Sequence, residues 1–140
     1  MAFEFYQTST RLRFVALWNL ADDSVLRLVR DSPESCGLEA WSPDGTKLLV
    51  YHGDQVDGIG YSLWYFRADD CTGEHGLSAF EKRLWSPCWN HDGTKIAYCV
   101  GEGDCLQCEP FGQVYVFDLA TQETTKIELP ANCRPVCLTW

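Results

Sequence analysis

A ten-residue stretch occurs twice in this chain, and it limits the possible folds more than any other feature. Residues 41–50 read Trp-Ser-Pro-Asp-Gly-Thr-Lys-Leu-Leu-Val, and residues 89–98 read Trp-Asn-His-Asp-Gly-Thr-Lys-Ile-Ala-Tyr. The copies share the Trp and the Asp-Gly-Thr-Lys, and the second lacks the Ser-Pro. They begin 48 residues apart (41 to 89), and a third Trp follows 51 residues later (89 to 140). A period of about 50 residues predicts a chain built from similar supersecondary units.

Each copy contains a tight turn between two β-rich segments. Pro43 suits the second position of a type I turn and Asp44 suits the third. Gly45 is then expected to end a three-residue hairpin loop in the left-handed conformation. Asp92 and Gly93 repeat the pattern. We interpret these five residues as structural turn residues, and we do not read the two aspartates as an acid–base pair.

The segments around the turns read as short strands separated by loops rich in Gly, Asp and Pro, and no helix of normal length is predicted. Residues 48–51 are apolar at successive positions, as a strand buried on both faces requires. The expected fold class is all-β. The twelve expected strands are residues 3–6, 13–20, 25–30, 36–41, 46–52, 61–67, 75–79, 84–89, 94–100, 113–118, 124–129 and 135–140.

The Trp-Ser-Pro-Asp-Gly at residues 41–45, followed by a short apolar strand, resembles the WD-like repeat of TolB-type β-propellers. The same repeat occurs in the propellers of tricorn-like and dipeptidyl-peptidase-like proteins. With the strands of a blade named a to d from the axis outward, the resemblance implies the order b-c-d, a-b-c-d, a-b-c-d, a. This is a single β-propeller repeat domain of about three four-stranded blades, or half of a six-bladed ring. The expected blade pieces are residues 1–35, 36–83, 84–134 and 135–140.

The charge balance restricts the partners. The 140 residues include 11 basic and 20 acidic ones, for a net charge of −9. A nucleic-acid partner is therefore not expected, because it needs a basic face. No run approaches the roughly 18 apolar residues of a membrane span. Residues 1–13 do not resemble a signal peptide, which favours the cytoplasm, while the TolB resemblance implies the periplasm as the alternative.

Two close cysteine pairs are candidates for a metal site. Cys105 and Cys108 are followed by Cys133 and Cys137, among eight cysteines in all. Two such pairs are typical of structural zinc. The first pair is expected in a b–c loop and Cys133 in a d–a crossover, which open on the same face of a propeller. Zinc is one interpretation, and loop thiols or a disulfide are the others; the main expectation is no cofactor.

Carboxylates gather in two predicted b–c loops on that same face. Asp54 and Asp57 lie in the first loop, and Glu102, Asp104 and Glu109 lie in the second. They predict a docking surface for a basic peptide, or a calcium site built from carboxylates and carbonyls. The alternative is an ordinary solvated surface, because acidic loops usually need no partner.

Residues 60–64, Gly-Tyr-Ser-Leu-Trp, come nearest to the Gly-x-Ser-x-Gly elbow of hydrolases but lack its final glycine and enter a predicted strand. His52, His75 and His91 are expected in or beside loops and turns, so no nucleophile–base pair is predicted.

The chain is therefore predicted to be a non-enzymatic scaffold for protein–protein interaction, with a homodimer that closes a six-bladed ring. The alternatives are the propeller of a larger peptidase-type enzyme whose catalytic domain is absent here, and a zinc-stabilised structural module.

Overall fold

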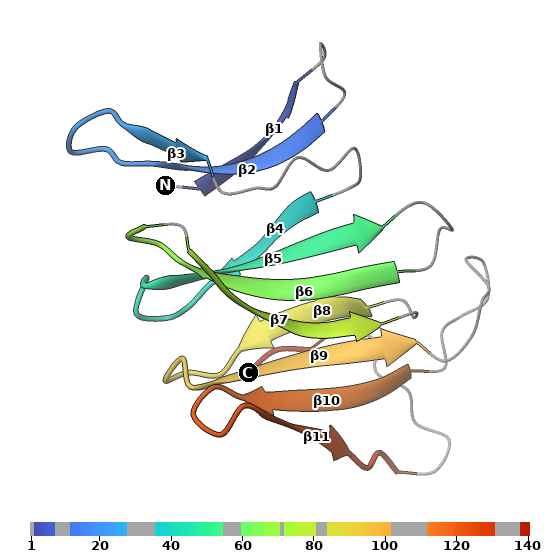
Figure 1. Cartoon of the computed structure of the whole chain (residues 1–140). Helices are drawn as coiled ribbons and strands as arrows, with labels where there is room; N and C mark the ends of the chain where they lie inside the picture. Colours follow the sequence, from blue (N-terminus) through green and yellow to red (C-terminus); the bar gives the residue numbers. More distant parts are fainter. Residues whose placement is uncertain are drawn as a thin grey trace.

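The computed structural model describes residues 2–7, 12–27, 36–54, 60–70, 72–80, 84–101, 112–130 and 138–140. Within these residues the chain forms eleven strands and no helix, in three antiparallel sheets (Figure 1). The all-β class is therefore confirmed. This part of the chain has no helix that could cross a membrane.

In each sheet the strands follow one another in sequence order. The first sheet contains β1 (Ala2–Gln7), β2 (Leu12–Trp18) and β3 (Val25–Arg27). The second contains β4 (Cys36–Trp41), β5 (Lys47–Asp54), β6 (Gly60–Arg67) and β7 (Gly73–Phe80). The third contains β8 (Leu84–Trp89), β9 (Lys95–Gly101), β10 (Gly112–Asp118) and β11 (Glu123–Ile127).

The three sheets are stacked in chain order (Figure 1). The first strand of the second sheet, β4, contacts β2 on one side and β8 on the other. Consecutive antiparallel sheets that pack face to face are the arrangement of propeller blades. The predicted order b-c-d, a-b-c-d, a-b-c-d matches these eleven strands.

The apolar core lies between the sheets, in two clusters. The cluster between the first and second sheets consists of Val15, Leu17, Leu48 and Val50. Leu49, the residue between Leu48 and Val50, instead joins the larger cluster between the second and third sheets. Successive strand residues point to opposite faces, so a strand between two sheets must be apolar at successive positions. This confirms burial on both faces for Leu48, Leu49 and Val50, whereas Tyr51 is only half-buried.

The larger cluster is built from both sheets that it joins. Its buried members are Leu49, Leu63, Tyr65, Leu77, Leu84, Trp89, Ile96, Tyr98, Val100 and Phe117.

The prediction of a twelfth strand at residues 135–140 is wrong for the residues of this segment that the structure describes. Residues 138–140 are not in a strand, and residues 135–137 lie outside the described residues. The corresponding segments β4 and β8 pair with β5 and β9. A strand needs such a neighbour, because its backbone N–H and C=O groups must be paired. A sequence that suits a strand therefore forms one only where a partner is present.

Candidate functional site

The two repeated turns adopt the predicted left-handed conformation at their glycines. Gly45 has a φ of 69° and Gly93 a φ of 70°. The N–H of Gly45 donates to the Ser42 carbonyl at 2.9 Å, and that of Gly93 donates to the Asn90 carbonyl at 3.0 Å. These bonds define four-residue turns with Pro43 and His91 at the second position.

The hairpin loop is one residue longer than expected. The N–H of Ser42 donates to the Lys47 carbonyl at 2.9 Å, so residues 43–46 lie within the loop. The extra residue is Thr46, whose N–H and Oγ1 donate to the carboxylate of Asp44 at 3.0 and 2.8 Å. These bonds hold Thr46 in the turn and delay the start of β5 until Lys47.

The carboxylates of the two turns are engaged in structural hydrogen bonds. Ser42 Oγ donates to Asp44 Oδ1 at 2.5 Å. This bond, with those from Thr46, lowers the pKa of Asp44 to about 2. Asp92 accepts from the N–H and Oγ1 of Thr94 at 3.1 and 2.5 Å, and the Thr94 hydroxyl is the main cause of its lowered pKa. Both groups are anions at neutral pH and unsuited to act as general acids.

The same Asp-x-Ser/Thr arrangement occurs in two further turns, whose hydrogen bonds were not predicted from the sequence. Asp22 accepts from the N–H and Oγ of Ser24 at 2.9 and 2.6 Å. Asp70 accepts from the N–H and Oγ1 of Thr72 at 3.0 and 2.8 Å. The signal that could have revealed them is Asp followed two residues later by Ser or Thr, since an Asp side chain often caps the backbone two residues on.

Asn90 replaces Ser42 in the second copy of the turn. Lys47 N–H donates to Ser42 Oγ at 2.9 Å, and Lys95 N–H donates to Asn90 Oδ1 at 2.8 Å. Both side chains are almost fully buried. The apparent loss of Ser in the second repeat is therefore a change of residue type that preserves the hydrogen bond.

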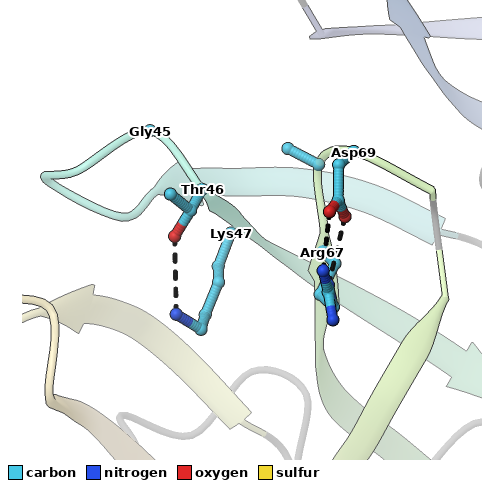
Figure 2. A pocket seen from close by; sticks show the side chains of 6 residues that line it. Gly45, Thr46, Lys47, Arg67 and Asp69 are labelled. Atoms are coloured by element: carbon cyan, nitrogen blue, oxygen red, sulfur yellow. Dashed lines mark hydrogen bonds and ion pairs between the residues drawn. The ribbon is translucent and has the colours of Figure 1, made fainter.

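A pocket of about 630 Å³ lies beside the first of these hairpins (Figure 2). It opens between the β4–β5 loop and the turn after β6, which are joined by a bond of 2.9 Å from Ala68 N–H to the Thr46 carbonyl. Its described lining residues are Gly45, Thr46, Lys47, Arg67, Ala68 and Asp69. The sequence reading did not find this pocket, because its two sides are about 20 residues apart in the chain.

Three charged side chains line the pocket. The guanidinium of Arg67 donates from Nε to Asp69 Oδ1 at 3.1 Å and from Nη2 to Asp69 Oδ2 at 2.6 Å. The Arg67 hydrogen bond is the main cause of the lowered pKa of Asp69. On the other side of the pocket, Lys47 Nζ donates to Thr46 Oγ1 at 3.4 Å (Figure 2). The described lining residues therefore comprise two cations and one carboxylate.

The sequence-predicted binding residues fall mostly outside the described residues. All four cysteines of the proposed zinc site lie there: Cys105, Cys108, Cys133 and Cys137. So do Asp57, Glu102, Asp104 and Glu109, while Asp54 is the last residue of β5. In the described part of the chain, no three His, Cys, Asp or Glu side chains could hold a metal together. The zinc site and the acidic docking surface therefore stay predictions.

Ser62 and two histidines lie inside strands. Ser62 is in β6, and its Oγ accepts a hydrogen bond from Trp64 Nε1 at 2.8 Å. His52 and His75, expected in or beside loops, lie within β5 and β7, where they pair with Ser62 and Tyr65. The strand pairing of β5 with β6 continues two residues beyond His52, to Asp54, which the Gly-rich sequence did not suggest.

Comparison with known proteins gave matches among solved structures alone: no family model and no curated protein matches the chain. The β-propeller domain of the Trilobed protease from Pyrococcus furiosus, described as having an open velcro topology, has a TM-score of 0.72 and 17% identity. The alignment covers 96% of this chain and 41% of that one. The chain has the fold of a partial β-propeller.

Two further structures agree with this fold. The uncharacterized protein lmo1340 from Listeria monocytogenes EGD-e has a TM-score of 0.68 and 13% identity, over 92% of this chain and 36% of that one. The Pyrococcus horikoshii acylaminoacyl peptidase has a TM-score of 0.61 and 14% identity, over 94% of this chain and 23% of that one. This chain thus spans less than half the length of each. The finer resemblance to TolB-type propellers is tested by none of them and stays a prediction.

Proposed function

We propose that this chain is a non-enzymatic β-propeller scaffold that mediates protein–protein interaction through the open edge of its first sheet. The observation that carries the proposal is the strand count: the second and third sheets have four strands, whereas the first has three. Within the described residues, β1 is the outermost strand of that sheet and pairs with β2 alone. An edge strand offers N–H and C=O groups to a strand from a partner.

The partner strand we propose is residues 135–140 of a second copy of the chain. The segments that form β4 and β8 each end in the repeated tryptophan, at Trp41 and Trp89, and residues 135–140 end in Trp140 in the same way. In Figure 1 the N-terminus lies at the first sheet and the C-terminus lies well apart from it, so one chain does not bring the two together. Two copies joined head to tail at both seams would complete each other and close a six-bladed ring.

Size-exclusion chromatography with light scattering tests this assembly. We expect a dimer with twice the chain mass of 15.9 kDa, and a monomer after deletion of residues 135–140. Hydrogen exchange of the β1 amides in the deletion variant should slow when a synthetic peptide of residues 135–140 is added, because the peptide pairs with that edge. A peptide with the same composition in scrambled order is the control. A well-folded full-length monomer, or aggregate alone, would contradict the proposal.

A second candidate function is the propeller of a larger peptidase-type enzyme. The likeness to a protease propeller and to an acylaminoacyl peptidase supports it, as does the short span of this chain relative to both. Sequencing the gene on both sides of the region that encodes these residues tests this candidate. A Gly-x-Ser-x-Gly segment in a strand–turn–helix context would favour it. The chain alone should not hydrolyse peptide or ester substrates, and activity lost in Ser62→Ala would show that Ser62 is a nucleophile.

A further inference from the structure

The hairpin and turn that line the pocket in Figure 2 have counterparts in the third sheet, and the two sets of residues can be aligned one by one. Ala68 N–H donates to the Thr46 carbonyl at 2.9 Å, and Leu119 N–H donates to the Thr94 carbonyl at 3.0 Å. The neighbouring positions follow from these matching bonds. Lys47 corresponds to Lys95, and Arg67 corresponds to Asp118.

In the third sheet this position is neutral. Lys95 and Asp118 are register partners on β9 and β10, and Lys95 Nζ lies 2.6 Å from Asp118 Oδ2. The bond to Lys95 is the main cause of the lowered pKa of Asp118. Asp118 Oδ1 also accepts from the N–H of Ala120 at 2.9 Å. A carboxylate thus lies against the lysine and the turn that follows the strand.

In the second sheet the same position holds two cations. Lys47 and Arg67 are register partners on β5 and β6, and like charges placed directly opposite each other on neighbouring strands are destabilising. The carboxylate of this region is instead that of Asp69, two residues after Arg67, and the Arg67 guanidinium binds it. Among the described residues, Lys47 forms no ion pair, and its hydrogen bond is the long one to Thr46.

The nearby Asp44 does not take the place of the missing carboxylate. The charge of Lys47 contributes to the lowered pKa of Asp44, as the weakest of the causes. The Asp44 oxygens are held in the turn by Ser42 and Thr46. Lys47 and Arg67 both line the pocket of about 630 Å³. They do so in a chain whose net charge is −9.

We propose that this pocket binds an oxyanion, a carboxylate or phosphate group, where the third sheet holds the Asp118 carboxylate. The bound anion lies against the Lys47 ammonium and reduces the repulsion between Lys47 and Arg67. Guanidinium and ammonium groups both bind carboxylates and phosphates. Among the described residues, the chain supplies a carboxylate at this position in the third sheet alone, so we assign the oxyanion to a ligand or to a partner.

Titration of the chain with inorganic phosphate and, separately, with acetate tests the proposal. The NMR signals of the lysine Cε–Hε groups are followed at constant ionic strength, with Lys95 as the internal control. We expect the Lys47 signal to shift and saturate at roughly millimolar anion, while the Lys95 signal stays in place. A shift with phosphate alone identifies a phosphate site, and a shift with acetate identifies a carboxylate site. Equal shifts of both lysines, or no shift of Lys47 with either ion, would overturn the proposal.

Two variants locate the binding. Arg67→Asp gives the second sheet the charge pattern of the third, so we expect the Lys47 shift to disappear. Lys47→Gln should abolish binding measured by the broadening of the phosphate ³¹P signal, and it decides the question if Arg67→Asp does not fold. Lys126→Gln changes an exposed lysine on β11 elsewhere in the chain and should leave binding intact. Phosphate binding that survives both Lys47→Gln and Arg67→Asp would place the anion elsewhere and refute the site.

Discussion

The second and third sheets share the chemistry of their hairpins but differ in what surrounds the repeated residues. Trp41 and Trp89 hold the same position in the repeat, yet Trp41 is 37% exposed and Trp89 is 6% exposed. Trp89 packs against Tyr65 of the second sheet, with ring centroids 6.4 Å apart at 72°. Its Nε1 also donates to the Ala40 carbonyl at 3.4 Å. The repeat sets the local turn, and the neighbouring sheet sets how much each repeated side chain contributes to stability.

The largest expected difference in stability is between alanine variants of the two tryptophans. Trp89→Ala should lower the free energy of unfolding by about 3–5 kcal/mol, because it removes a large side chain from the core between two sheets. Trp41→Ala should cost about 1 kcal/mol or less, as for most partly exposed positions. Urea unfolding followed by circular dichroism measures both. Equal losses would show that the two positions are equivalent after all.

A second contrast concerns two glycines that lie beneath tryptophan rings. A Cβ on Gly112 would lie 2.8 Å from Trp85 Cζ2, whereas one on Gly76 would lie 3.0 Å from Trp64 Cζ2. Gly112 is buried and Gly76 is exposed. Gly112→Ala should therefore cost about 1–3 kcal/mol of unfolding free energy through overpacking, and Gly76→Ala less. Thermal unfolding of the two variants compares them, and a larger loss at Gly76 would contradict this packing argument.

The buried polar residues of the two turns should tolerate exchange better than removal. Ser42→Ala and Asn90→Ala should each cost about 1–3 kcal/mol, because each leaves buried or partly buried groups without their hydrogen bonds. Ser42→Asn and Asn90→Ser should cost less, since Ser42 and Asn90 accept the same bond from the following lysine N–H. Chemical denaturation of the four variants is the measurement. Exchanges as costly as the alanine variants would mean that the two turns are not equivalent.

The smallest expected contribution to stability comes from the carboxylate of Asp44. Its pKa in the folded chain is about 2, below the ordinary 3.8. The folded state therefore holds the proton less tightly than the unfolded state. The resulting stability is present above about pH 4 and is lost as the pH falls toward 2. Because Asp44 is exposed, solvent screening keeps this contribution small.

Carboxyl carbon NMR shifts recorded against pH measure the Asp44 pKa directly. Ser42→Ala should raise it toward 3.8, because the Ser42 hydroxyl is the main cause of the shift. Asp92 is the control. Its lowered pKa is caused mainly by Thr94, so it should not change in the Ser42→Ala variant. An Asp44 pKa that does not respond to Ser42→Ala would assign the shift to Thr46 instead.

The sequence predicted most of the fold because the deciding signals are local. Gly45 and Gly93 require φ > 0, and residues 48–51 are apolar at successive positions, so the turns and the strands buried on both faces follow from adjacent residues. The error in loop length also has a local cause, since the bonds from Thr46 to Asp44 hold Thr46 in the turn. The four cysteines and most of the acidic residues of the predicted sites lie outside the described residues, so those predictions stay untested.

The sequence by itself determined the repeat, the turns and the order of the strands, because turn geometry and strand burial depend on residues that are neighbours in the chain. Tertiary structure alone decided three other features. It paired Lys95 with Asp118 but placed Lys47 opposite Arg67, because strand register joins residues that are about 20 positions apart. It buried Trp89 and left Trp41 more exposed. It left residues 138–140 without a strand, because a β-strand is stable only where another strand satisfies its backbone hydrogen bonds.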